Sequence, residues 1–219
     1  MKRFLGLEAM QRFSIADVHG LWRHRNKIAA TGFLISLLII HGNLFAYEEP
    51  DSFAGLKFGE DLTTQIEKCP SSSYGGIDVL KILQSKIRCY DPIGAPQSYL
   101  LYNIGEIQRD VKNIFAHQVD GKLAAATLTF DSSKTRVLLS ILKERYGEPT
   151  IERVEPWVSK GGVKTTSMEA TWKGQKVSIT LTERSYKIDQ GSINYSTEAW
   201  REHLKRKEAE QVKKGASGL

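Results

Sequence analysis

The 219-residue sequence has few of the residues that define special classes of protein. It contains two cysteines and six prolines, while 41% of its residues are hydrophobic and 26% are charged. This composition excludes collagen-like, wholly disordered and polytopic membrane proteins. The length suits one globular domain, or two small ones that share a sheet.

The body of the chain also lacks an excess of either charge. The net charge is +6, but residues 47–200 hold 19 basic against 20 acidic residues. The basic excess lies in residues 1–46 and 201–214, outside the region expected to fold. A basic domain face is therefore not indicated, and no nucleic-acid partner is expected.

The sequence has a single long apolar run, and it lies near the start. Residues 28–47 carry no formal charge, Arg23, Arg25 and Lys27 precede them, and Ala46 is a small residue near the end. This arrangement is typical of a secretory signal peptide. The central run of about 13 apolar residues is shorter than the roughly twenty that a spanning helix needs.

We therefore predict that residues 1–46 form a signal peptide cleaved after Ala46, which makes the protein periplasmic or secreted. In that case no stable membrane insertion is expected. The alternative is an uncleaved anchor, formed by residues 28–46, that holds the protein at the inner membrane.

The two cysteines, Cys69 and Cys89, both lie in the part that would be exported. A pair of cysteines in an oxidising compartment favours a disulfide. Their spacing is far from Cys-x-x-Cys and no histidine lies nearby, so neither a redox pair nor a metal site is indicated.

The remaining pattern predicts an α+β fold, in which helices pack on one face of an antiparallel β-meander sheet. A helix followed by a meander occurs twice, which suggests two helix-plus-meander units. We expect one exported domain over residues 47–200 and a polar, charged tail, helical or disordered, over 201–219. The expected elements comprise strands at 53–59, 98–104, 151–158 and 191–196, hairpins around 120–121 and 174–175, helices from 60, 77, 131 and 198, and a loop at 90–96.

Hydrophobic periodicity then predicts the core. The expected hairpin registers pair Phe115 with Ala126 and Trp172 with Val177. The helix that begins after Asp131 presents one apolar stripe and ends at Gly147. The predicted structural core comprises Phe115, Leu138, Leu142, Tyr146, Trp172, Ile179 and Leu181.

Chemistry-bearing residues are scarce in the expected exported part. His117 is expected to be partly buried with one ring nitrogen satisfied, and His203 to be solvated on the last helix. No metal-binding or phosphate-binding motif occurs, so neither a metal site nor a cofactor is expected. No catalytic residue is assigned, although Asp110 and Glu106 leave open a small periplasmic hydrolase that uses carboxylates. Trp157 follows Pro156 on an expected edge strand and is a candidate binding anchor.

Two short segments carry a resemblance to known proteins. Residues 142–149 (LKERYGEP) and 53–59 (FAGLKFG) are similar to segments of small exported bacterial proteins. The order of elements over residues 53–196 resembles SmpA/BamE-type envelope proteins and the tandem β-lactamase-inhibitor-protein fold. The resemblance implies a non-catalytic binding or assembly module of the bacterial envelope, with another envelope protein as its partner. The lipidated cysteine of the SmpA/BamE pattern is missing here, so the resemblance does not extend to outer-membrane anchoring.

Overall fold

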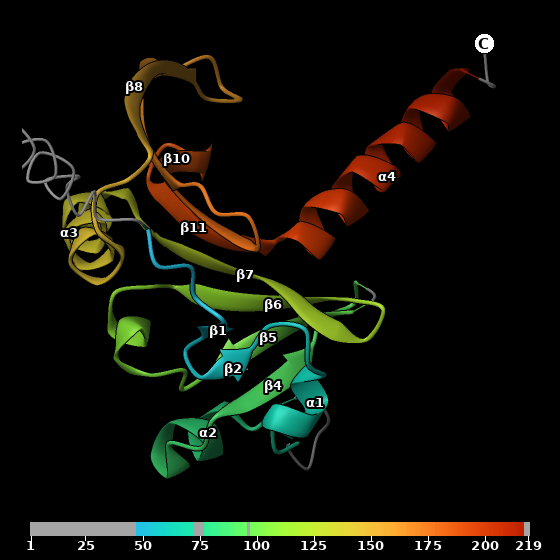
Figure 1. Cartoon of the computed structure of the whole chain (residues 1–219). Helices are drawn as coiled ribbons and strands as arrows, with labels where there is room; N and C mark the ends of the chain where they lie inside the picture. Colours follow the sequence, from blue (N-terminus) through green and yellow to red (C-terminus); the bar gives the residue numbers. More distant parts are fainter. Residues whose placement is uncertain (1–46, 72–76, 96, 217–219) are drawn as a thin grey trace, which may run out of the picture. The chain divides into compact units, whose positions relative to one another are not determined.

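The computed structural model describes residues 47–71, 77–95 and 97–216 (Figure 1). The predicted signal peptide or anchor, residues 1–46, lies outside these residues. Within the described part of the chain, no helix is long and apolar enough to cross a membrane.

The described chain forms two series of elements. The first comprises β1 (Ser52–Phe53), β2 (Leu56–Lys57), α1 (Leu62–Gln65), β3 (Glu67–Lys68), α2 (Val79–Ser85), β4 (Cys89–Pro92), β5 (Ser98–Tyr102), the 3₁₀ helix η1 (Glu106–Arg109), β6 (Asn113–Val119) and β7 (Lys122–Asp131). The second comprises the 3₁₀ helix η2 (Ser132–Lys134), α3 (Thr135–Tyr146), β8 (Ile151–Val158), β9 (Lys164–Trp172), β10 (Val177–Lys187), β11 (Gln190–Thr197) and α4 (Glu198–Ala216).

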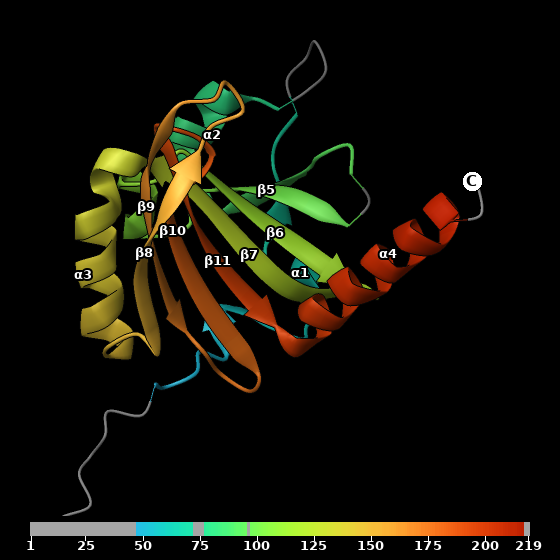
Figure 2. The ribbon, with the colours of Figure 1, turned by 90° about the horizontal axis from the view of Figure 1, so that it is seen from above.

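Nine of these strands form one sheet in the order β3-β4-β5-β6-β7-β11-β10-β9-β8 (Figure 2). All neighbours are antiparallel except β3 and β4. The strands of each series follow one another from an edge of the sheet to its centre, where β7 pairs with β11. The predicted α+β class with a meander sheet is confirmed.

The first long hairpin forms where the sequence predicts it, but its register changes. Asp120 and Gly121 have φ angles of 51° and 76°, as a tight two-residue turn requires. A β-bulge between His117 and Gln118 then shifts the pairing by one residue. Phe115 therefore pairs with Thr127 instead of Ala126.

A shift of one residue moves a side chain to the opposite face of the sheet. The core positions on β6 are consequently Ile114 and Ala116, both buried. Phe115 points to the other face and is only half-buried, so its assignment to the core is wrong.

The second hairpin is displaced from its expected register by two residues. Trp172 pairs with Ile179 instead of Val177, and Ala170 pairs with Leu181. Because side chains alternate with a period of two, this shift keeps the predicted set on one face. Trp172, Ile179 and Leu181 are fully buried, and the indole Nε1 of Trp172 donates to the carbonyl of Gly147 at 2.7 Å.

Helix α3 packs on the core face of the sheet. Leu138, Leu142 and Tyr146 are buried there. Ile141, from the same predicted stripe, is 41% exposed. Gly147 ends the helix with a φ angle of 77°, and its N–H donates to the carbonyl of Lys143.

Helix α4 begins against the opposite face of the sheet and then projects away from it, with residues 204–216 all exposed (Figure 1). The expectation that the helices share one face therefore holds for α3 but not for α4. Thr197 caps α4 by accepting from the N–H of Trp200. The helix contacts β6, β7 and β11, and the ring of Trp200 stacks on His117 with the centroids 5.0 Å apart. The expected tail is helical as far as Ala216.

The disulfide Cys69–Cys89, which the sequence also predicts, lies at the edge of the sheet formed by β3 and β4. Both cysteines are buried, and Ile82 of α2 packs against them. Two local expectations differ from the structure here: residues 53–59 form a small hairpin, and most of the expected loop 90–96 belongs to or borders β4. The helix expected from residue 60 is present as the four-residue α1. These elements are too short for periodicity to resolve them.

Candidate functional site

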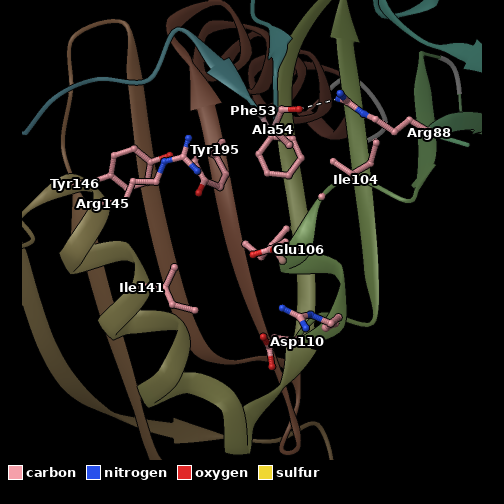
Figure 3. Close-up of a pocket in the computed structure, with 13 residues that line it drawn as sticks. Phe53, Ala54, Arg88, Ile104, Glu106, Asp110, Ile141, Arg145, Tyr146 and Tyr195 are labelled. Atoms are coloured by element: carbon pink, nitrogen blue, oxygen red, sulfur yellow. Dashed lines mark hydrogen bonds between the residues drawn. The ribbon is translucent and has the colours of Figure 1, made fainter. Parts of the chain in front are cut away.

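A cleft of about 530 Å³ opens on the core side of the sheet, between α3 and η1 (Figure 3). The β1–β2 hairpin closes one end. We call it the arginine-rimmed cleft, and its lining comprises Phe53, Ala54, Arg88, Ile104, Gly105, Glu106, Ile107, Arg109, Asp110, Ile141, Arg145, Tyr146 and Tyr195. A volume of this size suits a small ligand or a few side chains of a partner.

Aromatic and aliphatic side chains form the floor of the cleft. The rings of Phe53 and Tyr195 lie 5.1 Å apart, and Tyr195 meets Tyr146 edge to face at 6.4 Å. Burial raises the pKa of the Tyr195 hydroxyl well above its usual value, and the neighbouring Tyr146 adds to this effect. The Tyr195 hydroxyl therefore stays protonated at neutral pH and adds no charge to the floor.

Three arginines stand around this floor, one each from α3, η1 and the segment before β4. The guanidinium of Arg145 lies 5.4 Å from the Tyr146 ring centroid. Arg88 donates from Nη2 to the carbonyl of Ala54 at 2.7 Å, which ties the β1–β2 hairpin to the rim. None of Arg88, Arg109 and Arg145 forms an ion pair with another described residue.

The two carboxylates of the hydrolase alternative, Glu106 and Asp110, do lie together in this cleft. Asp110 is engaged, because Lys134 at the start of α3 lies 3.4 Å from its Oδ1. Glu106 stands on the exposed rim. The pair has a concave setting, but the structure brings neither histidine to it.

His117 belongs to the other face of the sheet, where it pairs with Ala125. Its Nδ1 lies 3.1 Å from the hydroxyl of Ser98, and its ring is covered by Trp200. Burial lowers the pKa of His117. The residue is therefore part of the contact that holds α4, and the sheet separates it from the cleft.

Trp157 lies on β8, at the open edge of the sheet. The β8–β9 hairpin is paired to β10 only between Glu169 and Trp172. Beyond this backbone pairing, residues 153–167 continue as a two-stranded projection, visible at the top of Figure 1, which we call the hairpin arm. Its base still contacts β10, because Arg184 donates to the Ser167 hydroxyl and to the carbonyl of Thr166. Trp157 is half-buried within it.

The hairpin arm and its surroundings concentrate exposed apolar side chains. Val154 and Val158 are 64% and 56% exposed. Of the twelve large apolar side chains exposed among the described residues, Val154, Val158 and Val163 lie on the arm, and Ile151 lies at the start of β8. Such a gathering is unusual for a surface that faces only water.

The sequence indicates Glu106, Asp110 and Trp157 as candidate functional residues, but it does not indicate the three arginines of the cleft. They lie in separate elements and follow no common spacing, so only the folded chain brings them to one rim. In the described ranges, no group of three or more histidine, cysteine, aspartate or glutamate side chains could hold a metal ion.

The described residues thus form an α+β domain with a concave cleft on one side of the sheet and an apolar projection at its edge. No family model, curated protein or solved structure matches the chain.

Proposed function

We propose that this chain is an exported, non-catalytic binding module of the bacterial envelope that recognises another exported protein through its hairpin arm. The observation that carries the proposal is the exposure of Val154, Val158 and neighbouring apolar residues on a projection that the sheet supports only at its base. An arrangement of this kind gains stability when a partner covers it.

The chemistry of the arm suggests an extended apolar segment as its partner. Strand β8 is an edge strand, and its outer side is not paired with any strand of the sheet. Arg153 is held by ion pairs to Glu155 and Glu169, so charges flank the apolar side chains without covering them. Pro156 lacks a backbone donor and would interrupt a long added strand. Trp157 and Val158 point to opposite faces of the arm, so side-chain contacts on both faces should carry the affinity.

The first residues after the predicted cleavage point support export. Tyr47 donates from its hydroxyl to the carbonyl of Val177 at 3.2 Å. Glu49 accepts three backbone N–H groups of the β9–β10 turn. Cleavage after Ala46 would leave these contacts intact, and the disulfide is compatible with an oxidising compartment.

The location can be tested directly by sequencing the N-terminus of the protein isolated from the cell envelope. We expect it to begin at Tyr47. A protein that retains residues 1–46 and fractionates with the inner membrane would instead establish the anchor alternative.

The partner can be tested by site-specific photo-crosslinking in living cells, with the crosslinking amino acid in place of Val158. Val212 on α4 provides a matched control, since it is 68% exposed but lies far along the chain on another element. We expect one discrete adduct with a different envelope protein at position 158 and no such adduct at position 212.

The partner identified in this way should then bind the purified protein directly. Trp157→Ala should weaken that binding roughly tenfold or more, as expected for an aromatic anchor, and Val212→Asp should leave it unchanged. Adducts that form equally at both positions, adducts between copies of this chain only, or the absence of any adduct would each refute the proposal.

A further inference from the structure

The arginine-rimmed cleft has features that docking at the hairpin arm does not use. The arm begins at residue 153, and the cleft lining includes no residue of β8, β9 or β10. Its floor is apolar and its rim carries three guanidinium groups. Both features require an explanation that is separate from the protein partner.

The arginines of the cleft form no ion pair with a described residue, which is also true of the exposed Arg136 and Arg206 but not of every arginine of the domain. Arg153 and Arg184 form ion pairs with glutamates, and Arg201 donates to the backbone carbonyls of Gln175 and Ser196. Arg109 and Arg145, in contrast, have no anionic partner among the described residues. A guanidinium group is a preferred partner for carboxylate, because its fork of N–H groups matches the two oxygens.

The charges are unevenly distributed along the cleft. In Figure 3, Phe53 lies between Arg145 and Arg88 at the hairpin end, and Asp110 lies toward the opposite end. The negative charges of Glu106 and Asp110 are partly offset by Arg109 on the same element and by Lys134. The hairpin end has two arginines and no carboxylate in the cleft lining, so it favours an anionic group and gives a ligand one orientation.

The apolar part of the lining continues away from the two arginines of the hairpin end. Ile104 is fully buried beneath the cleft, and Ile141 is 41% exposed along its α3 wall. The exposure of Ile141 departs from the buried stripe of its own helix. It leaves an aliphatic side chain free to contact a ligand body.

The two walls are also tied together without a ligand. Lys134 joins α3 to the end of η1 through Asp110, and Arg88 fixes the hairpin through Ala54. A site held open in this way does not have to be ordered by its ligand, which lowers the free-energy cost of binding.

From this geometry we propose that the arginine-rimmed cleft binds a small amphipathic carboxylate. The carboxylate lies at the Arg145 and Arg88 end, and the apolar body lies against the partly exposed side chains of Ile141 on α3 and Ile107 on η1. Carboxylates with an aliphatic apolar part and carboxylates with an aromatic one both fit this description, and comparing the binding of one probe of each kind distinguishes them.

The test uses the protein purified from the export compartment and two probes, decanoate and 2-naphthoate, titrated by calorimetry. We expect saturable 1:1 binding of at least one probe, and the tighter of the two shows whether the natural body is aliphatic or aromatic. Decylamine, which has the same chain and the opposite charge, should bind at least tenfold more weakly. Equal binding of decanoate and decylamine, or no binding of either carboxylate, would overturn the proposal.

Two variants locate the site. Arg145→Gln should weaken binding of the carboxylate by roughly ten- to a hundredfold, the effect of one charge-assisted hydrogen bond. The matched control is Arg136→Gln, since Arg136 is exposed on the same helix but does not line the cleft. An equal loss of carboxylate affinity in the two variants would mean that the ligand responds only to the overall positive charge of α3, and the proposed site would be wrong.

A third variant separates this inference from the proposed function. Ile141→Asp places a negative charge on an exposed wall, so the domain should still fold, and it should abolish binding of the carboxylate. Val158→Asp on the hairpin arm should leave carboxylate binding unchanged. If Val158→Asp weakens carboxylate binding as much as Ile141→Asp, the probe occupies the arm, and the assignment to the cleft fails.

Discussion

The two halves of the sheet are stabilised in different ways. The half from β3 to β6 has strands of two to seven residues, a bulge and a disulfide. The half from β8 to β11 has strands of eight to eleven residues and is packed around the fully buried Trp172. Short strands bury little surface, and a covalent link compensates for this where a large aromatic core does not. The comparison predicts that substitutions in the two halves differ in their effect on the free energy of unfolding and on the hydrogen exchange of individual strands.

The largest effect is expected from Trp172→Ala. The substitution removes a fully buried indole together with its hydrogen bond to Gly147, and it leaves a cavity. We expect a loss of about 3–5 kcal/mol in the free energy of unfolding, measured by urea denaturation. Trp157→Ala is the control and should cost less than about 1 kcal/mol, because Trp157 is half-buried on the arm. Equal denaturation midpoints for the two variants would show that the second half does not depend on this core.

The next effect concerns the disulfide. Replacing both Cys69 and Cys89 by alanine should destabilise the protein by about 3 kcal/mol, the chain-entropy value for a loop of this size. Hydrogen exchange sharpens the comparison: amides of β4 and β5 should lose protection first, while those of β10 and β11 retain it. A uniform loss over all strands would mean that the halves unfold as one unit. Two alkylatable thiols in the wild-type protein isolated from cells would contradict the disulfide itself.

A smaller effect is expected from Glu49, which holds the β9–β10 turn from the N-terminal segment. Burial would raise its pKa, but the backbone N–H groups of Val177, Gln175 and Lys176 outweigh burial and lower the pKa of Glu49. Glu49→Gln should therefore cost about 1–2 kcal/mol at pH 7.

The pH dependence of this loss of stability follows from the direction of the pKa shift of Glu49. Because the folded pKa lies below the unfolded one, the stabilising contribution is present at neutral pH and is lost as the pH falls below the ordinary carboxyl range. The difference between wild type and Glu49→Gln should consequently shrink on acidification. Glu48→Gln is the control, since Glu48 is exposed, and it should match wild type throughout.

The smallest effect concerns His117 at the junction of the halves, beneath α4. Burial lowers its pKa, so the folded protein takes up this proton less readily than the unfolded chain. Stability should be full above the ordinary histidine pKa of about 6.5 and should decrease as the pH falls below it. Thermal unfolding between pH 7.5 and 5.5 should therefore show a decrease that His117→Asn reduces. A decrease of the same size in His117→Asn and in the wild type would contradict this origin.

The two hairpins show how far the sequence could predict the core. Both turns form where Asp120-Gly121 and Gly174 indicate. The second register is off by two residues, yet the face of Trp172 is right because side chains alternate with that period. The first is off by one beyond the bulge, and the face of Phe115 is consequently wrong. Alternation alone cannot show where an extra residue enters a strand.

The bulge has a tertiary cause. It accompanies the burial of Gln118, whose side chain accepts from the Tyr99 hydroxyl and donates to Asp61 and the carbonyl of Gly121. Asp61 lies 57 residues away in the chain. No local sequence pattern around Gln118 indicates that Asp61 is its partner. Once the chain has folded, the buried amide is stable because it is fully hydrogen-bonded.

Local physical chemistry thus determined the elements whose signals are contained in a few neighbouring residues. These are the turn at Asp120-Gly121, the helix between Asp131 and Gly147, and the pairing of the only two cysteines. The tertiary structure decided everything that depends on residues far apart: the bulge at Gln118, the position of α4 on the second face, and the meeting of Arg88, Arg109 and Arg145 around one cleft. The reason is that side-chain periodicity and turn preferences act over a few residues, whereas a cleft is made by elements that only the closed sheet brings together.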